Sequence, residues 1–316
     1  MSDERLFTRP EMLGSTGVRP ERDPGSFRAR RNVYLPADSV PVDAVDRYLL
    51  RVRAAHRTLT GEHVFSHESA LALLGLPSLH RWPEVVHLVC ERRSGGRSQL
   101  DVVRHCIGLE HVTPVTVEGM LVTSPGRTAF DIALSRSFAE AVVVADAAFR
   151  LYPESRAEFG TLVDAYGRRR GFQRAQAVLR FADPRSGSAG ESLSRVEMDR
   201  LGFVAPDLQV RVVTGDVEDF ADFGWRAVRA LGEFDGEVKY REDRYRRGGS
   251  VEDVVIREKT RENRMRRQYA SFARWDWWDL RGRRLEGILV RAGVPKRRDA
   301  VTRPDVTQYS SPARGR

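Results

Sequence analysis

The sequence predicts an α/β protein with an α+β N-terminal region and a C-terminal mixed sheet flanked by helices. Its 316 residues suggest about two domains and are enough to bury at least one core. Runs with a helical spacing of apolar residues alternate with short runs rich in β-branched and aromatic residues. The clearest linker, RSGSAGES, starts at Arg185 and precedes a helix that Ser188 or Ser192 can cap. We therefore expect the two parts of the chain to divide at this linker.

Composition divides the chain further. The opening segment has few apolar residues and many arginines, prolines and glycines, and the last segment has no apolar periodicity. We expect a basic arm or degenerate winged-helix segment at 1–40, an α+β domain at 41–184, a second domain at 185–294 and a disordered basic tail at 295–316.

The chain is basic, with 53 lysines and arginines against 44 acidic residues, a formal net charge of +9 and an isoelectric point near 10.0. The planar guanidinium of arginine suits phosphate groups better than an ammonium does. This balance favours DNA as a partner. The alternative is that a genome rich in G and C favours arginine codons throughout the chain.

Location is inferred from cysteines and hydropathy. Two cysteines, Cys90 and Cys106, make no disulfide framework in a chain of this length, which favours a reducing compartment. No apolar run approaches the length of a membrane span, and MSDERLFTRPEM is too charged for a secretory signal. We expect a soluble cytoplasmic protein with no membrane partner.

The first predicted strand is FRARRNVYLP, in which Val33 and Leu35 pack inward while Arg28, Arg30 and Arg31 face outward. It resembles the wing of the winged-helix module that begins many AbiEi-like type IV antitoxins. A recognition helix precedes that wing in the family. The stretch GVRPERDPGSF contains two prolines where helical spacing is required, so either this helix is lost or the segment is only an arm.

The middle of the chain alternates helices and strands. Helices are expected at 41–59 and at SHESALALLGLP, where Ser66 is the cap and Gly75 the stop. The runs EVVHLVCERR, QLDVVRHCIGL and VTPVTVEGMLVTSP predict a small sheet, and helices are expected from 126 to 184. The passage 66–150 resembles the second part of AbiEi-like antitoxins, which implies a toxin partner or a homodimer.

Metal-ligating side chains also occur in this region, but their spacing does not predict a zinc site. Zinc ligands usually come in tight pairs such as Cys-x-x-Cys, and none is present. Asp131 and Asp146 are expected to be helix caps or to lie on solvated faces. The residues weighed as zinc ligands are His87, Cys90, His105, Cys106 and His111.

The chemistry is expected in DFADFGWRAVRALGEFDGEVKY, residues 219–240, which predicts two strands joined by a tight turn near Arg226 and Ala227. With a two-residue turn, Asp222 lies diagonal to Glu233, and their carboxylates repel unless a cation lies between them. The opposing interpretation is a strand pair with solvent-facing acids and one weak ion pair.

The spacing of a strand Asp, then Glu-x-Asp-Gly, then a basic residue resembles the PD-(D/E)XK nucleases, most closely the branch similar to very-short-patch-repair endonucleases. The likeness covers about 191–280 and implies a restriction-endonuclease-like sheet. It implies Mg²⁺ or Mn²⁺ as cofactor. The implied metal ligands are Asp222, Glu233 and Asp235, and the implied catalytic set adds Glu191 from the leading helix and Lys239. Asp235 occupies the slot where the superfamily motif has its lysine, which leaves the role of Lys239 open.

Two functions follow from the sequence. The first is a metal-dependent DNA nuclease, in repair or in defence, with the arginine-rich helix near 251–269 as a phosphate track beside the site. The second is a non-catalytic DNA-binding antitoxin or regulator of AbiEi-like type that keeps the nuclease-like fold as a scaffold.

Overall fold

The computed structural model divides the chain into two compact units. It describes residues 6–90, 101–105, 113–167, 170–236, 251–282 and 284–297. Within these residues, unit 1 comprises 6–136 and 151–180, and unit 2 comprises 137–150 and 181–297. The main division at 180/181 falls just before the Ser/Gly-rich stretch that begins at Arg185. A helix from the middle of the chain also belongs to unit 2, which the sequence did not predict.

Unit 1 begins with a three-stranded sheet of order β1-β3-β2 and two helices. Its elements are β1 (Phe7–Thr8), α1 (Arg9–Thr16), β2 (Ser26–Arg30), β3 (Val33–Pro36) and α2 (Ala44–Thr58). Helix α1 precedes the hairpin, so the segment is not an extended arm. The start of this helix was overlooked in the sequence, where Thr8 and Glu11 have the spacing of a capping box. The Thr8 N–H donates to the Glu11 carboxylate at 2.5 Å. Gly17, with φ +69°, ends the helix.

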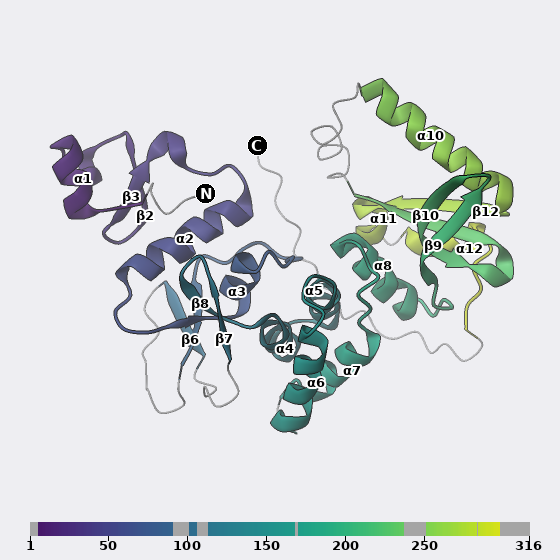
Figure 1. The fold of residues 1–316 in the computed structure, drawn as a ribbon, viewed down its shortest axis with the longest axis horizontal. Helices are drawn as coiled ribbons and strands as arrows, with labels where there is room; N and C mark the ends of the chain where they lie inside the picture. Colours follow the sequence, from purple (N-terminus) through teal and green to yellow (C-terminus); the bar gives the residue numbers. More distant parts are fainter. Residues whose placement is uncertain are drawn as a thin grey trace. The chain divides into compact units, whose positions relative to one another are not determined.

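The rest of unit 1 is a five-stranded mixed sheet of order β6-β5-β4-β8-β7 covered by helices (Figure 1). The strands are β4 (Val64–Phe65), β5 (Val86–Val89), β6 (Val102–His105), β7 (Pro114–Val117) and β8 (Met120–Thr123). The helices are α3 (His67–Leu73), α4 (Pro125–Ser135), α6 (Ser155–Tyr166) and α7 (Phe172–Phe181). The small sheet and its helices were predicted. β4 was missed because two residues are too short for a periodicity.

Asp131 and Asp146 were wrongly assigned to caps or solvated faces. Asp131 is buried, and its carboxylate accepts from the Arg127 Nε at 2.9 Å. Burial raises the pKa of Asp131 to about 6, and the charge of Arg127 opposes that rise. Asp146 is also buried, and it pairs with Arg195 at 2.8 Å. The sequence alone identified neither arginine as a partner, because the residues of a buried ion pair cannot be told from exposed charged residues by their spacing.

Unit 2 is built on a four-stranded sheet of order β12-β11-β10-β9, in which β11 and β12 are parallel and the other pairs antiparallel. Its strands are β9 (Asp207–Thr214), β10 (Val217–Trp225), β11 (Ala230–Asp235) and β12 (Ser271–Asp276). Its helices are α5 (Phe138–Leu151), α8 (Ala189–Arg200), α10 (Val251–Gln268), α11 (Trp277–Arg281) and α12 (Leu285–Arg291).

Helices α8 and α10 cover opposite faces of this sheet (Figure 1). On one face, Leu231 packs with Met265 of α10 in an apolar cluster. On the other, the Trp275 Nε1–H donates to the Ser194 hydroxyl of α8 at 2.8 Å. Gly190 of α8 lies so close to the sheet that a Cβ there would approach the Phe234 ring to 1.9 Å. The absence of a side chain at Gly190 therefore allows the first turn of α8 to lie directly on β11.

The disordered tail was predicted to start at residue 295, but the ordered chain extends at least to Arg297. Lys296 forms a β-bridge with Phe203, and the Arg297 N–H donates to the Gly202 carbonyl at 2.8 Å. Residues 298–316 lie outside the described part of the chain. Among the described helices, none combines the length and the apolar character needed to cross a bilayer.

Candidate functional site

The β10–β11 connection is longer than the predicted two-residue turn. It is a 3₁₀ turn, Arg226–Val228, followed by Arg229 with φ +49°. The resulting register pairs Phe223 with Gly232. The ladder ends at that pair, before Asp222 and Glu233 are reached, and the charge of Asp222 still raises the pKa of Glu233. The two acids are therefore neighbours, as predicted, while the predicted two-residue turn is wrong.

The sheet is irregular at the position of Asp222. The β9–β10 ladder pairs Ala221 with Val210 and Phe223 with Leu208, and it passes over Asp222 and Gln209 between them. Gln209 has φ +51°, a conformation that side chains rarely adopt in a strand.

Strand β10 also changes face at this point. Ala221 belongs to the apolar cluster beneath α10, whereas Phe223 stacks on Trp275 with ring centroids 5.2 Å apart. Regular alternation would put residues 221 and 223 on the same face. Asp222 thus lies where β10 passes from one face of the sheet to the other.

Where β10 and β11 part, the Asp222 carboxylate accepts a hydrogen bond from the backbone of β11. The last ladder pair is Phe223 with Gly232, and beyond it the Phe234 N–H donates to Asp222 Oδ2 at 2.9 Å. A side-chain oxygen thereby satisfies a strand donor that would otherwise lack a strand partner. This bond fixes Asp222 beside Glu233 where the two strands part.

Glu233 is buried and held by two arginines. Its Oε1 accepts from the Arg261 Nη2 of α10 at 2.6 Å, and its Oε2 from the Arg274 Nη2 of β12 at 3.2 Å. Burial raises the pKa of Glu233 to about 7. The charge of Arg261 opposes this rise and the charge of Asp222 adds to it. The Arg261 Nη1 also donates to the Phe220 carbonyl at 2.8 Å, so this guanidinium bridges the gap between the strands.

Asp235 joins the same group through Arg274, whose Nε lies 3.2 Å from its carboxylate. The Arg274 Nη1 donates to Glu262 of α10 at 3.1 Å. The group thus contains the carboxylates of Asp222, Glu233, Asp235 and Glu262 and the guanidiniums of Arg261, Arg274 and Arg266, the last of which pairs with Glu262 at 2.6 Å. With all of them charged, one negative charge remains in excess.

Glu191 lies on α8, on the side of the sheet away from α10. Its carboxylate accepts from the Gly187 N–H at 2.7 Å and from the Ser188 hydroxyl at 2.9 Å. It also accepts from the Gln209 Nε2 at 3.0 Å, which links it to the irregular point of β9. Ser188, one of the two serines that the sequence offered as the cap, caps α8 by accepting from the Glu191 N–H at 3.2 Å.

The structure therefore brings Asp222, Glu233 and Asp235 together and connects Glu191 to the neighbouring strand through Gln209. Lys239 lies outside the described residues. Sequence reasoning missed Gln209 and Arg274. Gln209 could have been noticed in the sequence, because it is a polar amide inside the apolar run LQVRVV. For Arg274 no signal existed, because its role depends on the parallel pairing of β12 with β11.

The donor set fits a hard divalent cation. Carboxylate oxygens are the ligands that Mg²⁺ prefers, and Mg²⁺ commonly takes only one or two protein carboxylates, leaving the other positions to water and substrate phosphate. Asp222 and Glu233 match that pattern, and the excess negative charge favours a cation. Within the described ranges, no three His, Cys, Asp or Glu side chains gather closely enough to hold an ion by themselves.

A second cluster of titratable groups lies in unit 1, where His67 joins two histidines that the sequence had singled out. His87 and His105 share a hydrogen bond of 2.9 Å between Nδ1 and Nε2, and the His67 ring stacks on that of His105 at 3.6 Å. Glu68 lies 3.3 Å from the His87 Nε2 and pairs with Arg136. Cys106 and His111 lie outside the described residues.

Burial lowers the pKa of each of the three imidazoles. His67 is shifted well below its ordinary value, and His105 falls to about 4, first by burial and then by the charge of His87. For His87, burial is again the main cause, and the charge of Glu68 opposes it. The unfolded chain therefore binds more protons than the folded one, so this stabilisation is complete above about pH 6.5 and is lost as the pH falls toward 4.

We expect hydrogen–deuterium exchange protection in β5 and β6 to fall roughly tenfold between pH 7 and pH 5, after correction for the intrinsic rate, because the imidazoles must be protonated. The variant His105→Gln should show a shallower fall, since it removes one titrating ring from the stack. An equally steep fall in this variant would contradict the assignment.

Comparisons with known proteins yield few relatives. No family model matches the chain. It is 30% identical over 172 residues to two Mycobacterium tuberculosis proteins, uncharacterized protein MT2308 (strain CDC 1551 / Oshkosh) and uncharacterized protein Rv2248 (strain ATCC 25618 / H37Rv). The match covers 54% of this chain and 58% of each relative. The crystal structure of the RV2827C protein from M. tuberculosis matches with a TM-score of 0.36 and 17% identity, over 60% of this chain and 76% of that one. A likeness of that size supports no conclusion about fold or function.

Proposed function

We propose that unit 2 is a metal-dependent nuclease that hydrolyses phosphodiester bonds in DNA, using Mg²⁺ or Mn²⁺, in repair or in defence. The observation that carries the proposal is the Asp222–Glu233 pair at the place where β10 and β11 part. Asp222 is fixed there by the Phe234 N–H, and the raised pKa of Glu233 reflects a buried carboxylate beside another. A divalent cation is the ligand that would relieve this repulsion.

Each side chain has a role in the proposal. Asp222 and Glu233 would hold the cation, and a bound cation would supply a more acidic water and a Lewis acid for a phosphoryl oxygen. Arg261 binds the phosphate, because its guanidinium already spans the gap between the two strands. Arg274 positions Glu233 and Asp235. Glu191 and Gln209 support the irregular point of β9 from the side of α8.

The second candidate is a non-catalytic DNA-binding regulator that keeps the same scaffold. One observation favours it: both oxygens of Glu233 are already bonded by arginines, so the group is largely neutralised without a metal. In this case DNA binding is independent of metal, and an antitoxin-like role implies a toxin partner or a homodimer.

The test is cleavage of supercoiled plasmid by the purified chain in Mg²⁺, in Mn²⁺ and in EDTA. We expect nicked and linear products with either metal and none with EDTA, in amounts that follow the protein peak through two chromatography steps. Intact DNA and intact RNA under all three conditions would refute the nuclease and leave the regulator.

A further inference from the structure

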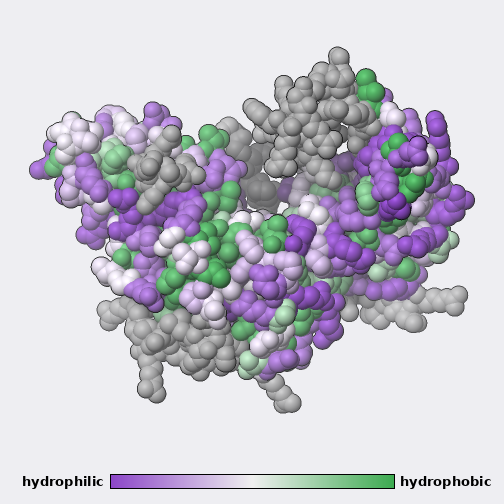
Figure 2. All heavy atoms as spheres, in the orientation of Figure 1, coloured by the Kyte–Doolittle hydropathy of each residue, from purple (hydrophilic) through white to green (hydrophobic). Residues whose placement is uncertain are grey.

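Unit 1 has a basic cavity of its own, far along the sequence from the carboxylates of unit 2. Its volume is about 970 Å³, and it opens between the β2–β3 hairpin and helix α2. In Figure 2 the surface of this part of the chain is largely hydrophilic. Eight residues line it: Arg28, Ala29, Arg30, Arg31, Asn32, Arg51, Thr58 and Asp101.

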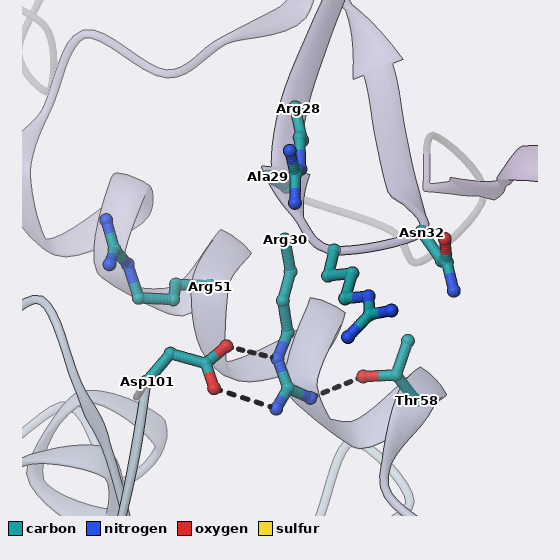
Figure 3. Close-up of a pocket in the computed structure, with 8 residues that line it drawn as sticks. Arg28, Ala29, Arg30, Asn32, Arg51, Thr58 and Asp101 are labelled. Atoms are coloured by element: carbon teal, nitrogen blue, oxygen red, sulfur yellow. Dashed lines mark hydrogen bonds and ion pairs between the residues drawn. The ribbon is translucent and has the colours of Figure 1, made fainter. Parts of the chain in front are cut away.

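Arg30 forms the base of the cavity and is not outward-facing, as the sequence had suggested. Its side chain is only 8% exposed, and its Nε and Nη2 donate to the two Asp101 oxygens at 2.5 and 3.1 Å (Figure 3). The Nη1 donates to the Thr58 hydroxyl and to the Ala55 carbonyl. The hydrogen bonds from Arg30 lower the pKa of Asp101. Arg30 thus neutralises Asp101, the one acidic residue of the lining, and its hydrogen bonds to Ala55 and Thr58 connect the hairpin to α2.

The other three arginines supply the positive charge. Arg28 and Arg31 are exposed, and within the described residues neither has an acidic partner at ion-pair distance. Arg51 is half-buried on α2 and donates to the Glu84 carbonyl, which orients it without neutralising it. Arg31 and Asn32 form the hairpin turn, where Asn32 has φ +65°, a conformation that asparagine tolerates. The tight turn places Arg31 in the lining of the cavity together with Arg28 and Arg30.

The lining also indicates what the cavity does not recognise. None of the eight lining residues is aromatic, and the only apolar side chain among them is Ala29. Stacking on bases requires aromatic faces, so the cavity offers no surface on which bases could stack. Clustered guanidiniums bind phosphate oxygens strongly, because their paired N–H groups match the geometry of the phosphate.

We propose that this cavity binds the phosphate backbone of a nucleic acid without regard to sequence. Four guanidiniums against one carboxylate leave three positive charges in a concave surface, which suits consecutive phosphates along a strand better than one small anion. Hydrolysis in unit 2 is not required, so the site stands whether or not the chain is a nuclease.

The experiment measures binding of the full chain to two fluorescein-labelled 20-base-pair DNA duplexes of unrelated sequence, in EDTA, by fluorescence anisotropy over a range of salt. We expect Arg28→Ala combined with Arg31→Ala to weaken binding to both duplexes by the same factor, about tenfold or more. The slope of log K against log salt should fall by about two, one for each phosphate that the double variant no longer binds. Both side chains are exposed, so the double variant is expected to fold normally.

The matched control is Arg81→Ala, which removes an exposed arginine of unit 1 that does not line the cavity. It should leave both the affinity and the salt slope nearly unchanged. The proposal is overturned if the double variant behaves like the Arg81 control. It is also overturned if the loss is confined to one of the two sequences, since that would mean base readout. Competition by free inorganic phosphate at low millimolar concentration would identify a small-anion site instead and would equally overturn it.

Discussion

Replacing Asp222 by asparagine should reduce metal-dependent DNA cleavage by at least about a hundredfold, because even residues that only support a metal ligand cost 10–100-fold when they are removed. The amide oxygen of asparagine can still accept the Phe234 N–H bond, which Asp222 now accepts at 2.9 Å. The fold is therefore retained while one negative charge beside Glu233 is lost. The measurement is the initial rate of plasmid nicking in Mg²⁺ together with Mn²⁺ affinity by calorimetry.

Glu218→Gln is the matched control. Glu218 lies on the same strand, is exposed, and pairs only with the exposed Arg211 among the interactions that the structure defines. It should cleave DNA at the parental rate. If the Asp222→Asn protein binds Mn²⁺ and cleaves within threefold of the parent, Asp222 holds no metal and the nuclease assignment loses its main support. Loss of cleavage with unchanged DNA affinity in EDTA is the pattern we expect.

Replacing Arg195 by methionine should destabilise unit 2 by about 3–5 kcal/mol, because it leaves a buried carboxylate without its counter-charge. Asp146 of α5 is fully buried and Arg195 of α8 is 10% exposed, with 2.8 Å between them. Burial already raises the pKa of Asp146, and Arg195 is the main opposing influence. The Arg195 Nη2 also donates to the Phe181 carbonyl at 2.7 Å. The pair therefore joins α5 to the helix that carries Glu191.

Urea unfolding followed by tryptophan fluorescence measures this effect selectively, because four of the five tryptophans lie in unit 2 and only Trp82 lies in unit 1. The control is the double variant Asp146→Leu with Arg195→Met, which removes both charges and should recover much of the lost stability. An unchanged midpoint in the single variant would mean that water reaches Asp146 and that the pair contributes little.

If both results hold, α8 is a structural support for the site and Asp222 is part of its chemistry. The distinction is physical. Glu191 is bonded within its own helix start and to Gln209, so it acts on the strands through packing and hydrogen bonds. Asp222 instead is half-buried where β10 and β11 part, and its carboxylate lies beside that of Glu233.

Much of the local structure could be predicted, because it depends on neighbours in the chain. The cap at Ser188, the helix 251–268 and the strands around Val86 and Met120 follow from periodicity and from residues within one turn. Predictions failed where distant segments meet. Arg30 seemed to face solvent because nothing near it in sequence shows that Asp101 is its partner.

The candidate site shows the same division. The sequence by itself determined that Asp222 lies on one strand and that Glu233 and Asp235 lie on the next, because the two apolar runs are close in the chain and form one hairpin. Only the tertiary structure decided that β10 changes face at Asp222 and that Arg261 and Arg274 meet Glu233. It also decided that three histidines stack in unit 1. The physical reason is that strand order, helix docking and burial are set by the whole chain, and the charge and pKa of each group follow from them.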